Sequence, residues 1–459
     1  MYSTLRKIKN LLITVLMMII LVTAAAAENA DEDRKVYTLD GLYSLALKRS
    51  EQVGISEEDL FLAKQTRKKA LSVLVPKLSA FGTHTEYLLN ESFTDFFNDS
   101  GGEGGSFSFS SPDSTNTYGL QVSQEFTLNG KELIALKITE DTIAKAEFDL
   151  SSVREEVLFG IAAAYFDVLK AEKILDIARA NVDRLTTYRD AVDVKLQLEE
   201  VAKTDKFRAE AELSNAKAEL LAVENQLKYA RAVLSQLTGL SGNYGVTDTE
   251  ALMDPTEDQG ITDLQSVAYE HRTELKSMEK QQTIAEKQVR YYQSEYWPTV
   301  SLNGSYSKTK QSPSGAFVMS SEDFSVGLTL KFSLFDGGLK KARVGEALAQ
   351  KRQVDLEHRS VKKQIDLEVE QSYLSVISAK SVLGALEDQT AYARSNYEAV
   401  LKQFQYGVAN SVDIMDANTL LVTAERQFSD AGYTYQLAIL KLKCSQGVFL
   451  SSLEEKGIL

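Results

Sequence analysis

The chain has 459 residues, of which 51 are Lys or Arg and 65 are Asp or Glu, so its net charge at pH 7 is −14. This balance argues against nucleic acid as a partner, because phosphates favour basic surfaces. The single cysteine, Cys444, excludes an internal disulfide, and its place in an apolar helical stretch predicts a buried, unreactive thiol.

Residues 1–27 are expected to be a signal peptide. Three positive charges precede an apolar stretch at 11–22, and the small residues Ala24 to Ala27 suit a cleavage site. An uncleaved membrane anchor is the alternative. Beyond residue 27 no apolar run is long enough to cross a bilayer as a helix, so we expect the mature chain to be exported.

Residues 28–237 predict a first structural unit, which begins with a helix. Pro76 closes that helix and opens two alternating segments, so a β-hairpin is expected at 76–128. No proline interrupts the next stretch, which predicts a long helix at 131–200 and a return helix at 203–237. At ~1.5 Å per residue the long helix would span roughly 100 Å, which is longer than a compact domain.

A connector rich in Gly and Asp follows at 238–261, and the same order of elements then repeats in a second unit at 262–445. The connector is expected at mid-height of the helices, and a C-terminal tail at 446–459 is expected at the same level. The elements predicted within the second unit are a helix, a β-hairpin (298–335), a long helix (339–404) and a return helix (411–445).

The two units are related by an internal repeat. From Val153 to Leu213 the chain matches itself at a constant offset of 208 residues, without a gap. Upstream the offset is 222, so the difference in length falls within the hairpins. The sequence therefore predicts a duplicated helix–hairpin–helix unit. Matched pairs include Tyr165/Tyr373, Val168/Val376, Asp205/Asp413, Ala209/Ala417, Leu42/Leu264 and Pro76/Pro298.

The four alternating segments predict strands with one apolar and one polar face. The last of them is the most regular, with apolar Phe324, Val326 and Leu328 separated by Ser325 and Gly327; the first is the least regular. A soluble sandwich gives the same pattern. Strands of about ten residues with apolar side chains outward are also typical of a transmembrane barrel.

The membrane interpretation requires an oligomer. Four strands cannot close a barrel, and open strand edges in lipid would leave backbone groups without hydrogen bonds. Several protomers must therefore contribute strands to one barrel. Tyr296 and Trp297 stand at a strand entrance, as expected of interfacial aromatic residues.

Residue patterns typical of catalysis are absent from the sequence. His84, His271 and His358 are far apart, and there is no His-Glu-x-x-His motif and no pair of cysteines. We therefore expect a protein that is not an enzyme and that needs no cofactor or metal.

One segment, Phe404 to Asp416, combines a helix stop at Gly407 with two aspartates one turn apart. Asp413 and Asp416 would lie in the first turn of the return helix, where the helix dipole stabilises acidic side chains. That purely structural explanation is one alternative. The other is that the aspartates surround the mouth of a helical tube, with Asp205 at the equivalent position of the first copy.

The segments Tyr296–Tyr306, Phe332–Gly338 and Tyr406–Ala417 resemble the TolC-type outer-membrane factors, and the resemblance covers nearly the whole mature chain. It implies a mainly α protein in which a homotrimer forms a 12-stranded transmembrane β-barrel, four strands per protomer. A long periplasmic α-helical coiled-coil barrel would continue from it. The implied location is the outer membrane of a Gram-negative bacterium.

The resemblance also implies a function and a set of partners. The protein would be a passive exit duct in a tripartite efflux or type I secretion system. Substrates would arrive from an inner-membrane pump of the RND or ABC type, through a periplasmic adaptor, and outer-membrane lipid would surround the barrel. The cargo is left open between a drug, a metabolite, a metal ion and a protein.

Site residues follow from the matching positions. The resemblance implies an entrance ring of Asp413 and Asp416, with Asp205 and Thr204 in the neighbouring turn. Phe404 and Ala409 replace the tyrosine and arginine that close the entrance in the type member. Lys203 or Lys206 paired with Asp413 is the substitute that we consider. The helix-turn tips expected to contact the adaptor are Gly407, Val408, Ala409, Val201 and Ala202.

A second class of function remains as the alternative. A periplasmic coiled-coil scaffold or adaptor without a membrane barrel would also have helical hairpins. The duplicated hairpins with lipid-type alternation favour the duct.

Overall fold

The structure is a computed structural model that describes residues 35–88, 114–242, 244–247, 252, 254, 260–312 and 321–457. The predicted signal peptide lies outside the described residues, as does much of the predicted connector. The described chain falls into two compact units. We call residues 55–152 and 273–364 the sheet unit. The hairpin unit comprises the residues before 55, residues 153–272 and the residues from 365 onward.

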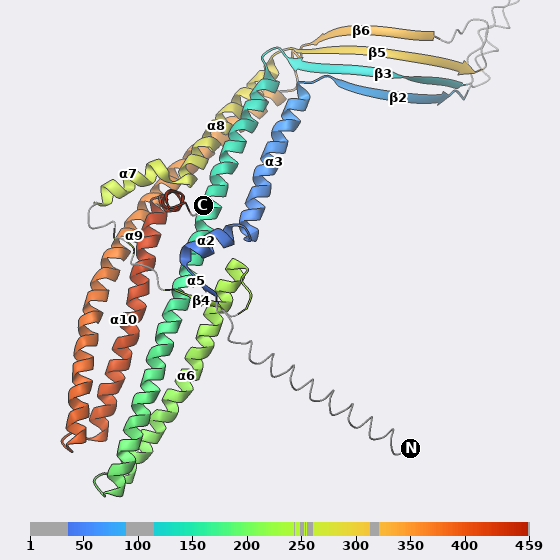
Figure 1. The fold of residues 1–459 in the computed structure, drawn as a ribbon. Coiled ribbons are helices and arrows are strands. Elements are labelled where there is room, and N and C mark those ends of the chain that lie inside the picture. The colour runs from blue at the N-terminus through green and yellow to red at the C-terminus, as the bar shows by residue number, and fades with distance from the viewer. Residues whose placement is uncertain are drawn as a thin grey trace, which may run out of the picture. The chain divides into compact units, whose positions relative to one another are not determined.

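The sheet unit contains four antiparallel strands in the order β2-β3-β5-β6 (Figure 1). The two central strands come from different copies of the repeat and pair over their whole length, for example Leu120 with Tyr306. The sheet therefore joins the two copies through backbone hydrogen bonds. The strands are β2 (Lys77–Glu86), β3 (Ser114–Thr127), β5 (Thr299–Ser312) and β6 (Ser321–Lys331).

One face of the sheet is apolar and the other is polar, as the alternation predicted. On the apolar face Tyr306 stands between Leu120 and Phe324. The polar face carries mostly Ser, Thr, Asn and Gln. Phe81 in β2 is an exception, because the register places it on the polar face across from Gly119. Most apolar side chains of the sheet are exposed, including Leu78, Phe324, Val326, Leu328 and Leu330 at 63–78%.

Each strand is followed or preceded by a helix within a few residues. Helix α3 (Glu51–Val73) leads into β2, and α5 (Lys131–Gln197) follows β3. Helix α8 (Thr273–Gln293) and the short 3-10 turn η4 (Ser294–Tyr296) lead into β5, and α9 (Leu339–Gln405) follows β6. The four helices thus meet the sheet at one end of its strands (Figure 1).

The second copy differs from the sequence prediction in its first helix, which is broken rather than continuous. Helix α7 (Ile261–His271) ends where Arg272 adopts φ −59° and ψ 120°, and α8 begins at the next residue. Gly447 lies against this break, because a Cβ on it would come within 2.8 Å of the Arg272 nitrogen. The break therefore accommodates the end of a helix distant in sequence.

The hairpin unit consists of two long helical hairpins and small elements packed on them. Helix α5 returns through α6 (Lys203–Thr238), and α9 returns through α10 (Ser411–Ser445). Its largest core surrounds Tyr165 and Leu158, which are fully buried. The small elements are α2 (Leu39–Leu47), α11 (Phe449–Glu455), β1 (Lys35–Tyr37) and β4 (Tyr244–Val246).

β1 and β4 form a two-stranded parallel ladder that the sequence did not predict. The expected grouping of these elements into two repeats with a belt between them stays a prediction. Among the described helices, none is both long enough and apolar enough to cross a membrane.

Candidate functional site

The candidate site is built on the turns that close the two helical hairpins, both within the hairpin unit. In the α9/α10 turn, Gly407 lies two residues after the end of α9 and is in the left-handed conformation, at φ 75°. The Gly407 amide donates to the Phe404 carbonyl at 3.1 Å, and the Val408 amide donates to the Gln403 carbonyl at 2.8 Å. This pair of bonds is a Schellman motif, which satisfies the last carbonyls of α9.

The α5/α6 turn has the same geometry without a glycine. Glu199, 208 residues before Gly407, is left-handed at φ 62°. Its amide donates to the Leu196 carbonyl at 3.1 Å, and the Glu200 amide donates to the Lys195 carbonyl at 2.9 Å. The motif ends α5 at Gln197, three residues before the predicted end. The two copies therefore keep the same turn, although only the second has a glycine at its left-handed position.

Asp205 and Asp413 have the same role, one in each copy. Asp413 Oδ2 accepts from the Asn410 amide at 2.9 Å, and Asp205 Oδ2 accepts from the Ala202 amide at 3.1 Å. Each aspartate thus holds the start of a return helix, which a carboxylate at this position is suited to do. The Asn410 side chain adds a bond from the Val412 amide at 2.7 Å. Helix capping explains why both copies carry an aspartate here.

Asp416 differs from the other two aspartates. It lies on the exposed surface of α10, one turn after Asp413, and no described residue bonds or pairs with it. The equivalent position in the first copy is Arg208. No capping requirement explains Asp416, so it is the better candidate for an electrostatic function.

The pairing of Lys206 with Asp413 that the sequence suggested is not found within the chain. Lys206 Nζ lies 2.9 Å from Asp193 and 3.9 Å from Glu210, and the hydrogen bond and charge of Asp193 raise the Lys206 pKa. Lys203 has no ion-pair partner among the described residues. The nearby Thr204 is exposed.

Phe404, expected at the entrance, lies in a core between the two hairpins and is only 4% exposed. Its ring packs against Tyr188 of α5 with centroids 5.2 Å apart. Burial raises the pKa of Tyr188, as expected for a phenol in an apolar core. Lys195 Nζ lies over the Phe404 ring at 5.6 Å. Phe404 therefore joins the hairpins within one chain.

The predicted tip residues divide into exposed and half-buried groups. Val408 is 77% exposed and its neighbour Tyr406 is 83% exposed. Val201 and Ala409 instead pack against the core that contains Phe404. Gly407 and Ala202 are exposed. Fewer of the predicted tip residues are therefore available to a partner than the sequence indicated.

Polar contacts between the hairpins were not predicted. Asn418 Nδ2 donates to Asn181 Oδ1 at 2.9 Å, and both side chains are buried. Glu425 of α10 lies 3.4 Å from Arg184 on α5, across the two hairpins, and 3.1 Å from Arg394 on α9, within its own hairpin. Buried asparagines within otherwise apolar helical seams were the signal that the sequence offered.

The predicted interfacial aromatics lie where η4 ends and β5 is about to begin. Tyr296 is 47% exposed and Trp297 is 54% exposed. Among the described residues, no three His, Cys, Asp or Glu side chains are grouped to hold a metal ion.

Known proteins resemble the chain in both sequence and fold. The family model described as "Outer membrane efflux protein" matches residues 42–240 and 264–448. The outer membrane protein TolC of Vibrio cholerae is 25% identical over 338 residues, 72% of this chain and 76% of the relative. TolC of Escherichia coli K12 is 24% identical, over 68% of this chain and 66% of the relative.

The fold is also that of a solved channel. The crystal structure of the Campylobacter jejuni CmeC outer membrane channel has a TM-score of 0.76, at 16% identity. The match covers 91% of this chain and 89% of that structure. At this identity the likeness shows the fold alone, which is the fold predicted from the sequence.

The family match covers most of both copies of the repeat and is interrupted at the connector between them. It confirms the predictions of an outer-membrane channel protein and of a protein that is not an enzyme, and the scaffold alternative is not supported. The chain belongs to the outer membrane efflux protein family, whose members are transport ducts.

Proposed function

We propose that three copies of this chain form one passive duct, with a 12-stranded barrel in the outer membrane and a helical tunnel in the periplasm. The observation that carries this proposal is the one-sided sheet. Its apolar face exposes Phe324 and Leu328 at 78% and 73%, a surface that lipid would cover favourably. Its polar face suits a water-filled lumen.

The sheet edges support an oligomer. β2 and β6 each pair with only one described strand, so each leaves one row of backbone groups without a strand partner. In lipid such an edge is costly, and pairing β6 of one copy with β2 of the next removes it. Three copies of four strands give the predicted barrel.

The partners are an inner-membrane pump and a periplasmic adaptor. Exposed Val408 and Tyr406 at the helix turns support adaptor contact at this end of the hairpins. Relatives named for different cargoes support a duct that does not select: AprF is named for alkaline protease secretion, OpmQ for pyoverdine export and CzcC for cobalt-zinc-cadmium resistance. Selection of the cargo then belongs to the pump.

The aspartates would make the entrance cation-selective. Threefold repetition of Asp413 and Asp416 would concentrate negative charge around the mouth, and such a ring attracts and binds multivalent cations. Because Asp413 also caps a helix, the test must separate its charge from its capping.

The test is planar-bilayer conductance of the purified protein, together with its migration as a heat-resistant trimer. Asp413→Asn with Asp416→Asn removes the charge and keeps a capping oxygen. We expect small cation-preferring channels, blocked from the tunnel side by multivalent cations, and weaker block in this double variant. The control is Glu58→Ala with Asp59→Ala, two exposed acids of α3. Unchanged block in the asparagine variant would exclude the ring, and a soluble monomer would exclude the duct.

A further inference from the structure

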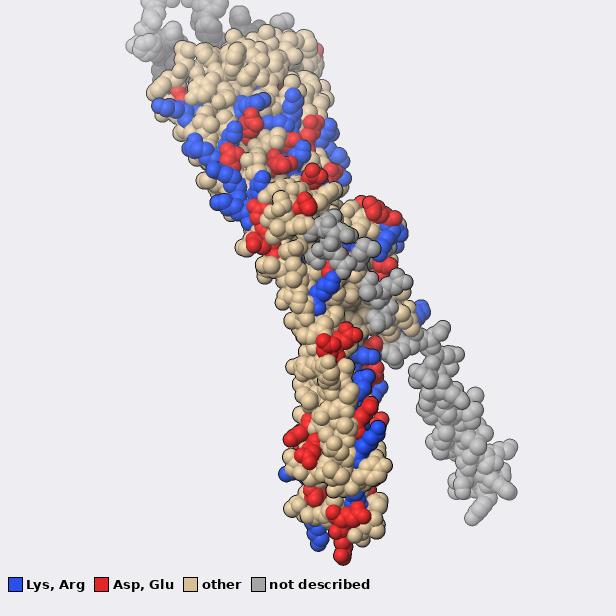
Figure 2. Space-filling model, turned by 90° about the vertical axis from the view of Figure 1, so that its left-hand side faces the viewer, with Lys and Arg blue, Asp and Glu red and all other residues tan. Residues whose placement is uncertain are grey.

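The helical turns next to the sheet carry a local excess of positive charge. We consider the seven residues of each helix nearest the sheet, together with the loop that connects that helix to its strand. For α3, α5, α8 and α9 these segments are 67–76, 128–137, 287–298 and 332–345. They contain ten Lys or Arg and three Asp or Glu, in a chain of net charge −14. Figure 2 shows Lys and Arg gathered below a cap with few charges. We call these ten residues the basic junction: Arg67, Lys68, Lys69, Lys131, Lys137, Lys287, Arg290, Lys340, Lys341 and Arg343.

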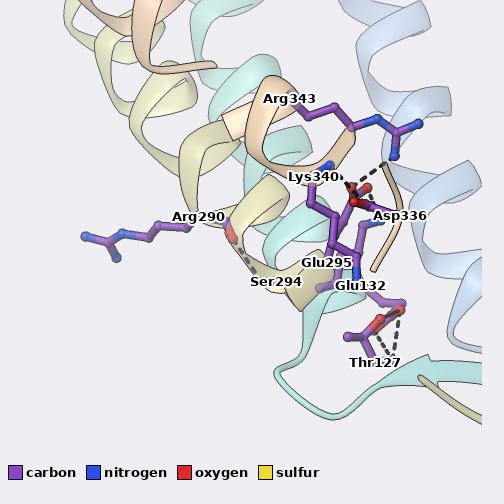
Figure 3. Close-up of polar contacts among 9 residues, drawn as sticks. Thr127, Glu132, Arg290, Ser294, Glu295, Asp336, Lys340 and Arg343 are labelled. Atoms are coloured by element: carbon purple, nitrogen blue, oxygen red, sulfur yellow. Dashed lines mark hydrogen bonds and ion pairs between the residues drawn. The ribbon is translucent and has the colours of Figure 1, made fainter. Parts of the chain in front are cut away.

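One of the three acids, Glu295, is already shared by two cations of the basic junction (Figure 3). Lys131 Nζ lies 2.8 Å from Glu295 Oε1, and Arg343 lies 3.0 Å from Oε2. Burial would raise the Glu295 pKa, but the hydrogen bonds and charges of these two cations lower it. Glu295 therefore remains ionised, and each of its oxygens already faces a cation of the basic junction.

The other two acids hold the backbone at the strand–helix turns. The Glu132 carboxylate accepts from the Thr127 amide at 3.1 Å and from its hydroxyl at 3.0 Å. Asp336 accepts from the Gly338 amide at 3.1 Å and the Lys340 amide at 3.0 Å. Both carboxylates are thus occupied by local structure (Figure 3).

Five lysines of the basic junction have no ion-pair partner among the described residues, and one of them, the half-buried Lys340, donates to the Ser333 carbonyl. The other four are exposed: Lys68, Lys69, Lys137 and Lys341. They come from three different helices that all meet the same sheet. Uncompensated like charges at one level repel one another, and an anionic partner would relieve that repulsion.

Exposed aromatic side chains lie in the same segments. Trp297 is 54% exposed, Phe332 is 52% exposed and Phe335 is 86% exposed. Lys340 Nζ lies 5.8 Å from the Tyr296 ring centroid and donates to the Ser333 carbonyl. Aromatic rings beside long basic side chains suit the boundary between acyl chains and headgroups. A purely polar anionic polymer would leave these rings in water.

We propose that the basic junction binds the phosphates of anionic phospholipids, in the leaflet that faces the periplasm. The proposal rests on the proposed function, because it requires the sheet to lie in the outer membrane. Trp297 and Phe335 would enter the acyl boundary while Lys68, Lys69, Lys137 and Lys341 contact headgroups. The lipid preference would orient the helical tunnel at the membrane surface and weaken with salt.

Trp297 is the only tryptophan of the chain, so its fluorescence reports on this surface directly. The full-length protein is reconstituted in phosphatidylcholine vesicles that contain either brominated phosphatidylglycerol or brominated phosphatidylcholine. We expect phosphatidylglycerol to quench Trp297 with a relative association constant roughly threefold to tenfold above that of phosphatidylcholine. This preference should disappear in 0.5 M salt, an ionic strength at which charges are screened within ~5 Å.

The test variant replaces Lys68, Lys69, Lys137 and Lys341 with Gln, and it should quench equally with both lipids. The control replaces four exposed lysines of the hairpin unit with Gln (Lys48, Lys217, Lys228 and Lys456) and should keep the preference. Heat-resistant trimers and conductance are measured for every protein. If the variant does not fold, the salt dependence of the native protein still decides the proposal.

Three outcomes would overturn the proposal, and they differ from one another. Equal quenching of the native protein by both lipids would exclude the lipid preference while leaving the duct intact. Equal quenching combined with sedimentation on purified peptidoglycan, lost in the variant, would assign the surface to that polymer instead. No quenching by either lipid and no conductance would remove the membrane barrel, and with it the proposed function.

Discussion

Glu199 and Gly407 share one left-handed backbone conformation at equivalent positions of the two copies, with φ 62° and 75°. Glu199 is the only described residue other than glycine with a positive φ. A side chain in this region meets the following carbonyl oxygen, which costs about 1–2 kcal/mol. The duplicated turn has therefore kept its hydrogen bonds in the first copy at the expense of strain.

Replacing Glu199 with Gly should relieve that strain and stabilise the protein by about 1 kcal/mol. Gly407→Ala should introduce the same strain into the second copy and destabilise by a similar amount. Thermal unfolding of the purified protein measures both changes, with Glu200→Gly as a control that should not stabilise. Opposite signs at the two equivalent positions are the expected result, and equal signs would contradict the shared geometry.

Gly447 should tolerate no side chain. Its φ is 70°, and a Cβ would lie 2.8 Å from the His271 carbonyl carbon and from the Arg272 nitrogen. Because both neighbours are backbone atoms, Gly447→Ala should lower the free energy of unfolding by at least about 2 kcal/mol.

Gly432 provides the control inside α10, the helix that ends just before Gly447. A Cβ there meets nothing within 4 Å, so Gly432→Ala should be neutral or stabilising by up to about 1 kcal/mol. Thermal unfolding again gives the readout. If the two substitutions have equal effects, the end of α10 does not press on the break at Arg272.

Stability should fall in acid through Glu368. Burial would raise its pKa, but Lys441 at 2.9 Å and Arg272 at 2.9 Å lower it below the ordinary value of 4.5. A folded-state pKa below the unfolded one stabilises the folded protein above the unfolded pKa. That contribution is lost as the pH falls from about 4.5 through the folded pKa.

Glu368→Gln should therefore reduce stability at neutral pH and flatten the fall of the melting temperature below pH 5. The control is Glu370→Gln, an exposed acid on the same helix, which should leave the pH profile unchanged. Melting curves between pH 3 and 7 test this. If the melting temperature of the Glu368 variant falls below pH 5 as steeply as that of the native protein, the loss of stability in acid is due to other carboxylates.

Local periodicity predicted the elements that depend on nearby residues. The strand faces around Leu328 and the long proline-free helices are of this kind, because their side-chain repeats are visible in the sequence. The left-handed Glu199 could not be read in the same way, since nothing in its residue type indicates that conformation. Only its alignment with Gly407 could have revealed it.

Features that join distant parts of the chain were less visible. The break at Arg272 contains neither Pro nor Gly, and the residue that lies against it, Gly447, comes from a distant part of the chain. Phe404 was expected at an entrance because of its matching position, but its partner Tyr188 lies more than 200 residues away in sequence. Asp413 was correctly placed in the first turn of its helix, while its role in an entrance remains a proposal.

The short ladder between β1 and β4 also has a mechanical consequence. Val36, which precedes the helices and strands of the first copy, pairs with Gly245, which follows them. The chain therefore enters and leaves that copy at one point. Tension applied before Lys35 would load this ladder and, through it, α5, because the Tyr165 hydroxyl donates to the Tyr37 and Thr247 carbonyls. The helices between β1 and β4 thus form a loop that is closed at its base both by the ladder and by a side chain of α5.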